Sequence, residues 1–183
     1  RLAIMDQDGE NNAFLTDGRE AALTPRFHPA ADRVAFMSYQ SREQPRVVLF
    51  DLNTRGQQVL GNFSGMTLSP RFAPDGRSVV LSAMRGGDAN IYAVDLASRR
   101  ERQLTSGSSL DVSPCYSPDG SQIVFNSDRG GDQQLYVMDA NGGGIRRISF
   151  GRGRYATPVW SPRGDLIAFT RFGGGSFAIG VMR

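Results

Sequence analysis

A repeat of about 44 residues runs through the chain and constrains its fold more than any other feature. Four segments of the form P-x-x-x-P begin at equivalent points, which are Pro25, Pro70, Pro114 and Pro158. Their spacings are 45, 44 and 44 residues. An aspartate that closes an apolar run recurs with the same three spacings, at Asp6, Asp51, Asp95 and Asp139. Two landmarks that keep one period over 183 residues indicate a chain built from structurally equivalent units.

Each unit predicts four short antiparallel strands joined by tight turns. In the third unit the expected strands are 112–117, 122–127, 134–139 and 145–149. They are rich in Val, Ile, Phe and Tyr, which favour a pleated and partly buried surface, and glycine-rich turns separate them. No segment shows a sustained 3.6-residue period, so helix is expected to be nearly absent.

A four-stranded unit near this length is typical of a β-propeller blade. The expected fold class is therefore all-β, a β-propeller with four-stranded antiparallel blades of about 44 residues. The expected division is a blade remnant at 1–16 and repeats at about 17–61, 62–105, 106–149 and 150–183. The first and last pieces both contain the third strand of a unit, so these roughly four blades are expected to form an arc of a six-bladed ring. A parallel β-solenoid is the alternative, although its coils are usually shorter and lack the repeated Asp-Gly turn.

Residues that recur in the units are expected to have a structural role at the strand ends and turns of each blade. Proline has no N–H for a ladder, which suits the end of the first strand, and Asp-Gly supports a tight turn after it. The residues assigned to this structural set are Pro29, Pro74, Asp75, Gly76, Pro118, Asp119, Gly120, Pro162, Asp51, Asp95 and Asp139. A calcium ion held by a ring of such carboxylates is the alternative, but the chain has no dense run of ligands. No metal and no cofactor are therefore expected.

Single residues and missing motifs exclude several kinds of site. The one cysteine, Cys115, cannot form an internal disulfide, and the one histidine, His28, cannot supply a multi-histidine metal site. The chain lacks a G-x-S-x-G elbow and a G-x-x-x-x-G-K-[ST] loop, so no catalytic residue is expected. No apolar run approaches ~18 residues, so no membrane insertion is expected.

The charge of the chain gives little support for nucleic-acid binding. All 21 basic residues are arginine, and the formal net charge is only +3. The densest basic stretch is IRRISFGRGR, in which Arg146 and Arg147 would face opposite sides of a strand. No nucleic-acid partner is therefore expected.

The amino-acid sequence of the repeat resembles that of the blades of the TolB family, the periplasmic component of the Tol-Pal system. The segments that carry the resemblance are PRFAPDGRSVVLSAMRGGDANIYAVD at 70–95 and PCYSPDGSQIVFNSDRGGDQQLYVMD at 114–139. It covers essentially all 183 residues, and several stretches are similar to alphaproteobacterial members. It implies a six-bladed propeller preceded by a smaller α/β domain, with that domain and the last blades outside this chain. The start at Arg1 without an initiator methionine fits a processed chain or an internal piece.

The resemblance also implies a function without catalysis. It implies a periplasmic, monomeric interaction scaffold that binds the lipoprotein Pal and communicates with TolA, maintaining outer-membrane integrity and supporting envelope constriction in cell division. Other envelope proteins and bacteriocins are further implied partners. One alternative is the propeller of a prolyl-oligopeptidase-like peptidase that gates a hydrolase domain, because such propellers carry similar repeats. Another is a carbohydrate-binding or sensor propeller, for which only Trp160 and scattered tyrosines are available.

The loops before the first strand of each unit are the predicted binding site. They lie at 17–23, 61–68, 106–112 and 150–156, and they differ between units while the frame stays constant, which suits an asymmetric protein partner. The residues assigned to partner binding are Leu23, Met66, Thr67, Leu68, Leu110, Asp111, Val112, Tyr155 and Ala156. Met66, Leu110, Val112 and Tyr155 are the candidate apolar anchors, and Thr67 and Asp111 are candidates for hydrogen bonds. Packing of these side chains between the blades is the alternative. The resemblance implies that this face receives Pal.

Overall fold

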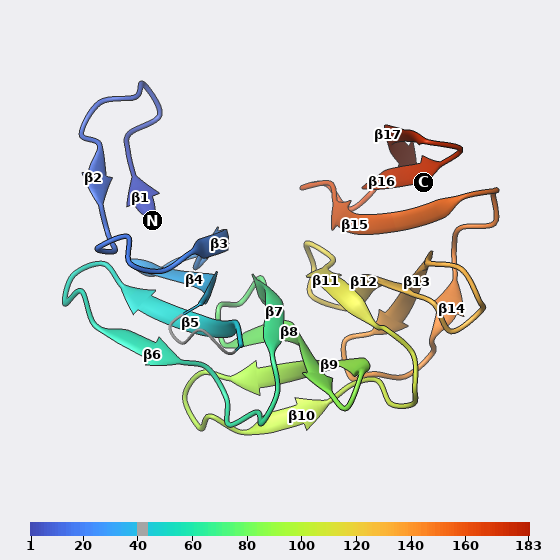
Figure 1. Cartoon of the computed structure of the whole chain (residues 1–183), viewed down its shortest axis with the longest axis horizontal. Coiled ribbons are helices and arrows are strands. Elements are labelled where there is room, and N and C mark those ends of the chain that lie inside the picture. The colour runs from blue at the N-terminus through green and yellow to red at the C-terminus, as the bar shows by residue number, and fades with distance from the viewer. Residues whose placement is uncertain (40–43) are drawn as a thin grey trace.

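The computed structural model describes residues 1–39 and 44–183, and every regular element in that part of the chain is a β-strand (Figure 1). The strands form five antiparallel sheets, each made of strands that follow one another along the chain. The prediction of an all-β fold with almost no helix is therefore confirmed.

Three of the sheets are complete four-stranded blades. Blade I comprises β3 (Ala22–Phe27), β4 (Arg33–Ser38), β5 (Arg46–Asp51) and β6 (Gln57–Val59). Blade II comprises β7 (Thr67–Phe72), β8 (Ser78–Arg85), β9 (Asp88–Asp95) and β10 (Glu101–Gln103). Blade III comprises β11 (Val112–Tyr116), β12 (Gln122–Ser127), β13 (Gln134–Asp139) and β14 (Arg146–Arg147).

The two remaining sheets lie at the ends of the chain. A two-stranded sheet pairs β1 (Ala3–Ile4) with β2 (Ala13–Phe14), and a three-stranded sheet contains β15 (Arg154–Trp160), β16 (Ile167–Gly173) and β17 (Ser176–Met182). Figure 1 shows the five sheets arranged as an open arc, with these two at its ends. The innermost strands β3, β7, β11 and β15 contact one another in that order, as in a propeller.

The strands predicted for the third unit agree closely with blade III. The second and third match β12 and β13 at both ends. The fourth is shorter than predicted, because β14 pairs with β13 only through Arg146 and Arg147. Beyond them, the amide of Leu135 donates to the hydroxyl of Ser149 at 2.8 Å, so a side chain takes the place of a ladder bond.

The hydrophobic core lies between neighbouring blades. One cluster joins Val80 and Ile91 of blade II to Ile123 and Phe125 of blade III, and similar clusters join the other adjacent sheets. The second strand of a blade, such as β8 or β12, is covered on both faces and is buried almost throughout. Its apolar residues therefore form a continuous run, whereas apolar and polar residues would alternate in a half-exposed strand. Each complete blade thus shares its apolar core with the neighbouring sheets.

A β-bulge interrupts each innermost strand at a Ser-Pro or Thr-Pro step. The pairing register of the first two strands shifts there in all four sheets. The residue before the proline has a left-handed φ in every case, at Thr24 (51°), Ser69 (53°), Ser113 (56°) and Thr157 (49°). This region is uncommon for non-glycine residues and more so for threonine. The bulge bends the strand where it reaches the centre of the arc.

Candidate functional site

The loops that precede the innermost strands are tied to the preceding sheet by an equivalent backbone hydrogen bond. The amide of Thr67 donates to the carbonyl of Pro45 at 3.0 Å, and that of Asp111 donates to the carbonyl of Ala89 at 2.8 Å. The amide of Tyr155 donates to Gln133 at 2.9 Å. Each of these three loops is therefore fixed at its end by a backbone hydrogen bond across the seam between two blades.

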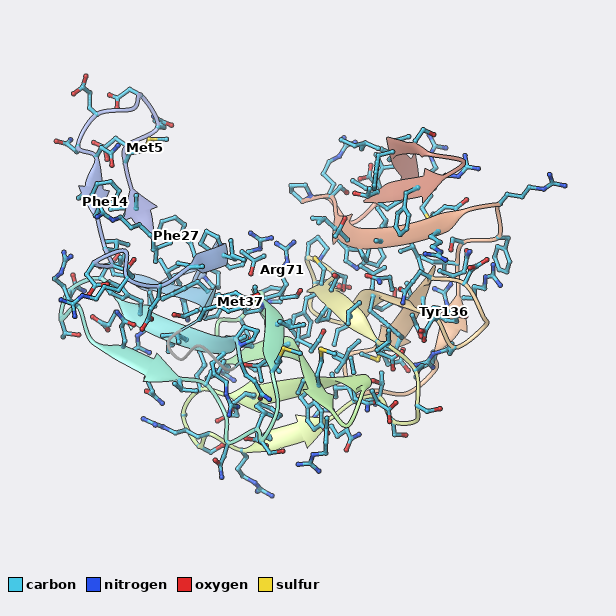
Figure 2. All side chains as sticks on the ribbon, viewed as in Figure 1. Met5, Phe14, Phe27, Met37, Arg71 and Tyr136 are labelled. Atoms are coloured by element: carbon cyan, nitrogen blue, oxygen red, sulfur yellow. The ribbon has the colours of Figure 1, made fainter. Side chains whose placement is uncertain are left out.

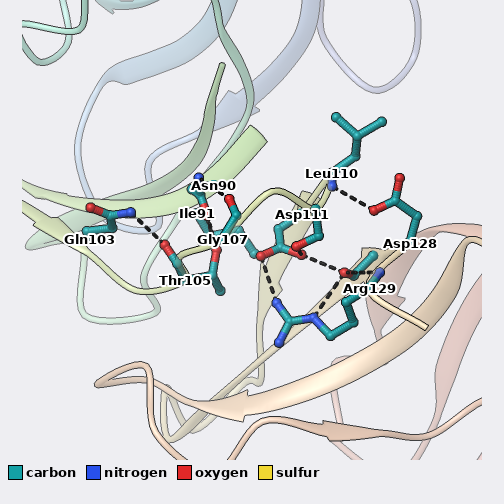
Figure 3. Close-up of polar contacts among 11 residues, drawn as sticks. Asn90, Ile91, Gln103, Thr105, Gly107, Leu110, Asp111, Asp128 and Arg129 are labelled. Atoms are coloured by element: carbon teal, nitrogen blue, oxygen red, sulfur yellow. Dashed lines mark hydrogen bonds and ion pairs between the residues drawn. The ribbon is translucent and has the colours of Figure 1, made fainter. Parts of the chain in front are cut away.

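An ion pair between the buried Asp111 and the partly exposed Arg129 fixes the loop before β11 (Figure 3). Asp111 has no exposed surface, and its carboxylate accepts hydrogen bonds from Arg129 Nη2 at 2.7 Å and Ser127 Oγ at 2.6 Å. The Arg129 guanidinium also lies over the rings of Phe125 and Tyr136, 5.4 and 5.3 Å from their centroids. This charge-assisted bond to a fully buried carboxylate holds the loop to blade III.

Further contacts hold the rest of this loop on both sides of the seam (Figure 3). The amide of Leu110 donates to Asp128 Oδ1 of blade III at 2.8 Å. On the other side, Asn90 of blade II donates to the carbonyl of Gly107 at 3.5 Å. Leu110 is therefore presented by a loop whose backbone is fastened to two blades.

Three of the predicted binding residues lie inside the seams. Thr67 and Asp111 are fully buried, and Tyr155 is 8% exposed with its ring 5.2 Å from that of Phe169. The three occupy equivalent positions at the start of an innermost strand. The side chain at this position packs between blades, as the alternative prediction described, because alternation along the strand turns it toward the neighbouring sheet.

The other six predicted residues remain accessible at the mouth of the arc. We define the channel-mouth surface as Leu23, Met66, Leu68, Leu110, Val112 and Ala156. Leu23 is 45% exposed and the other five are half-buried. Leu23, Leu68, Val112 and Ala156 are equivalent residues on neighbouring strands, so they form an apolar collar at one level of the arc.

An exposed aromatic residue in the last of these loops was not predicted as an anchor. Phe150 is 77% exposed, and the guanidinium of Arg147 lies 5.4 Å from its ring centroid. The sequence carried a signal, because Asp17, Asn62 and Ser106 are polar at the equivalent position. A large aromatic side chain in a position otherwise polar suits contact with a partner.

The aspartates of the structural set accept hydrogen bonds within turns. Asp51 Oδ1 accepts from the amides of Asn53 and Thr54, and the Thr54 bond is the main cause that lowers the pKa of Asp51. Asp95 is bonded in the same way, and the amide of Ser98 lowers its pKa. The remaining members lie in the same kinds of place: Asp75 Oδ1 accepts from Arg77, Gly76 and Gly120 have left-handed φ, Asp139 ends β13, and Pro29, Pro74, Pro118 and Pro162 follow the innermost strands.

Among the aspartates of this set, Asp119 has the most strongly lowered pKa. Its carboxylate accepts hydrogen bonds from the Ser117 hydroxyl at 2.5 Å and from the amide and hydroxyl of Ser121. These bonds, that of Ser117 foremost, lower the pKa of Asp119 to about 2. The carboxylate closes the turn between β11 and β12.

The single histidine links two blades. His28 Nδ1 accepts hydrogen bonds from the amides of Ala30 and Ala31, at 3.0 and 2.9 Å. The hydrogen therefore resides on Nε2, which donates to the carbonyl of Gly76 in blade II at 3.0 Å. Cys115 is buried beside Val124 and Val137.

Across residues 1–39 and 44–183, no group of three or more His, Cys, Asp or Glu side chains is arranged to hold a metal ion. The same part of the chain contains no helix of the length and apolar character needed to cross a membrane.

Comparison with known sequences gives one consistent family. The family described as "TolB beta propeller domain" matches residues 1–183. Proteins named "Tol-Pal system protein TolB" match from Gluconobacter oxydans (strain 621H), with 62% identity over 94 residues, and from Rickettsia akari (strain Hartford), with 49% over 90 residues. The alignments cover 51% and 49% of this chain, and the chain spans about a fifth (20%) of the length of each relative.

Comparison with solved structures agrees with the sequences. The structure of TolB from Acinetobacter baumannii has a TM-score of 0.84 and 32% identity, over 98% of this chain and 45% of that one. A puromycin-hydrolyzing peptidase from Mycobacterium tuberculosis has a TM-score of 0.75 but 15% identity, over 94% of this chain and 29% of that one. The second likeness shows the fold alone.

Proposed function

The chain belongs to the TolB beta-propeller family, and we propose that it is the propeller portion of a non-catalytic, periplasmic interaction scaffold of the Tol-Pal system. In this proposal the scaffold binds the lipoprotein Pal and communicates with TolA. Its task is to maintain outer-membrane integrity and to support envelope constriction in cell division. The names of the two sequence relatives support the assignment to this system.

The channel-mouth surface is the observation that carries the binding proposal. Its six residues are apolar and accessible, and they stand on strands or loops fastened to neighbouring blades. Apolar anchors on a rigid frame bind with little loss of conformational entropy. We assign the contact with Pal to this surface and to the exposed ring of Phe150.

The buried members of the predicted set have a supporting part in this proposal. Asp111 holds the loop that carries Leu110 through its bonds to blade III. Thr67 and Tyr155 anchor their loops through the seam bonds. They set the shape of the surface, while the six accessible residues and Phe150 make the contact.

The test is a calorimetric titration of the full-length protein with the soluble domain of Pal. Leu23→Ser should weaken binding at least about tenfold, since apolar anchors contribute more than 1 kcal/mol. Val59→Ser is the matched control, because Val59 is 43% exposed against 45% for Leu23 but lies on the outer strand β6. Equal affinity of both variants and the wild type would overturn the assigned surface.

The alternative function is that of a propeller that gates a peptidase. Its structural support is the likeness to a puromycin-hydrolyzing peptidase, which at 15% identity concerns the fold only. The TolB relatives carry much higher identity over the aligned part. An assay of the full-length protein for amidase activity on puromycin distinguishes the two functions. Absence of activity would favour the interaction scaffold over the peptidase gate.

A further inference from the structure

A small cavity lies at the centre of the arc, where the innermost strands of four sheets meet. Its volume is about 90 Å³, which is large enough to hold water or a small ion. Each of the four bulged Ser-Pro and Thr-Pro steps contributes at least its serine or threonine to the lining, together with two arginines, Arg26 and Arg71. The bulges therefore bring four hydroxyl-bearing residues, Thr24, Ser69, Ser113 and Thr157, to one small space.

The two arginines give this cavity a positive side. Arg26 and Arg71 occupy equivalent positions in β3 and β7, and Figure 2 shows Arg71 on the inner side of the arc. The equivalent residues in β11 and β15 are Cys115 and Val159, which carry no guanidinium. Among the described residues that line the cavity there is no aspartate or glutamate.

Both guanidinium groups lack an acidic partner in the described part of the chain. Arg26 Nη1 donates to the carbonyl of Pro25 at 2.7 Å, but its Nε is buried without any hydrogen-bond partner. Arg71 forms no side-chain hydrogen bond or ion pair with the residues described. Burial lowers the pKa of both groups, and the like charge of Arg71 lowers that of Arg26 further.

An anion would stabilise this arrangement of two half-buried arginines. Burying an unpaired cation is unfavourable, and two neighbouring cations repel each other. A guanidinium presents a planar fork of N–H donors that matches the oxygens of a carboxylate or phosphate. The left-handed φ values at the four bulges are strained, and strain of this kind gathers at ligand-binding sites.

We propose that this cavity binds a small oxyanion, a free carboxylate or phosphate, between Arg26 and Arg71. The anion accepts hydrogen bonds from the guanidinium N–H groups of Arg26 and Arg71, which line the cavity. The hydroxyls around the cavity supply further donors. This site lies inside the arc, and it goes beyond the partner contact proposed for the channel-mouth surface.

The experiment measures the thermal unfolding and calorimetric binding of the full-length protein with inorganic phosphate, with acetate, and with chloride at equal ionic strength. Phosphate or acetate should raise Tm above the chloride value, and the one that does so identifies the class of anion. Arg71→Gln should weaken that binding roughly ten- to hundredfold, the cost of losing a hydrogen bond to a charged group. Arg71→Lys should restore part of it, because the charge returns without the fork.

Arg77→Gln is the matched control, since Arg77 lies in the same blade but is exposed to solvent. It should bind the anion like the wild type. In chloride alone, Arg71→Gln should keep or raise Tm, because it removes a half-buried charge that has no acidic partner among the described residues. Three results would overturn the proposal: no binding of either anion, equal binding in Arg71→Gln, or a lower Tm of Arg71→Gln in chloride. The last would mean that a carboxylate elsewhere in the protein already pairs with Arg71.

Discussion

The hydroxyl of Thr67, in blade II, accepts a hydrogen bond from the amide of Val47, in blade I, at 2.7 Å. In three of the four other sheets the equivalent amides, those of Leu2, Ile91 and Leu135, donate to a hydroxyl in the last segment of their own sheet. The acceptors there are Thr16, Thr105 and Ser149. Blade I has Gly61 at that place, with a φ of 77° and no room for a Cβ beside Phe63. The neighbouring blade therefore supplies the missing acceptor.

Replacing Thr67 by valine should destabilise the propeller by about 1–3 kcal/mol, because the buried Val47 amide loses its acceptor at nearly constant volume. Thr67→Ser keeps the oxygen and should cost less. Urea unfolding of the full-length protein, followed by tryptophan fluorescence and circular dichroism, gives the difference. Equal stability of the valine and serine variants would contradict this assignment of the hydroxyl.

Asp111→Asn should destabilise the protein by about 3 kcal/mol or more, because it leaves the partly buried Arg129 without its carboxylate. Asp165→Asn is the matched control. The Arg163–Asp165 pair has a similar separation, 2.9 Å against 2.7 Å, but its side chains are 82% and 47% exposed. An exposed pair should contribute less than about 1 kcal/mol. Similar losses in both variants would show that burial is not decisive here.

Ser117→Ala should raise the pKa of Asp119 from about 2 toward the ordinary 3.8, because the strongest hydrogen bond to the carboxylate is lost. A carboxyl-carbon NMR titration measures this directly, and Ser98→Ala, which removes a hydroxyl bonded to Asp95 instead, is the control. The folded-state pKa of Asp119 is depressed, so its contribution to stability is present above pH 4 or so and lost as the pH falls through about 2. An unchanged titration in Ser117→Ala would refute the cause assigned here.

Gly76→Ala should destabilise the protein by about 1–3 kcal/mol, because an alanine there adopts a left-handed φ of 71° and its Cβ meets the His28 ring. Gly87→Ala tests the backbone effect alone, since Gly87 has a φ of 99° but open space around it. The difference between the two unfolding free energies isolates the contact. His28→Ala in the Gly76→Ala background should recover part of the loss, and no recovery would argue against the clash.

The fold could be predicted where turns bound the strands. The segments PDG and DRGGD mark both ends of β12, and the 44-residue period then fixes the blade. The bulge at each Ser-Pro or Thr-Pro step was not predicted, because a proline inside an apparent strand gives no sign of a left-handed residue before it. Bulges depend on how strands meet at the centre, which a local pattern does not contain.

The site could be predicted only in part for a similar reason. Strand periodicity located the loops, but Tyr155 and Leu23 look alike as apolar loop residues, and one is buried while the other is exposed. The neighbouring sheet that covers Tyr155 comes from a different unit. The shared cavity of Arg26 and Arg71 could not be predicted, because their equivalence across the units does not show that both side chains line one space.

The Thr67 hydroxyl, which blade II supplies to the Val47 amide of blade I, also limits how such a chain can change by duplication or exchange of its units. A blade that begins with an alanine, as blade I does at Ala22, offers no oxygen to the amide of Val47. Inserting a second copy of blade I between blades I and II would leave that amide unpaired. The units are similar in shape yet not interchangeable, because hydrogen bonds that cross the seams require particular units to be neighbours.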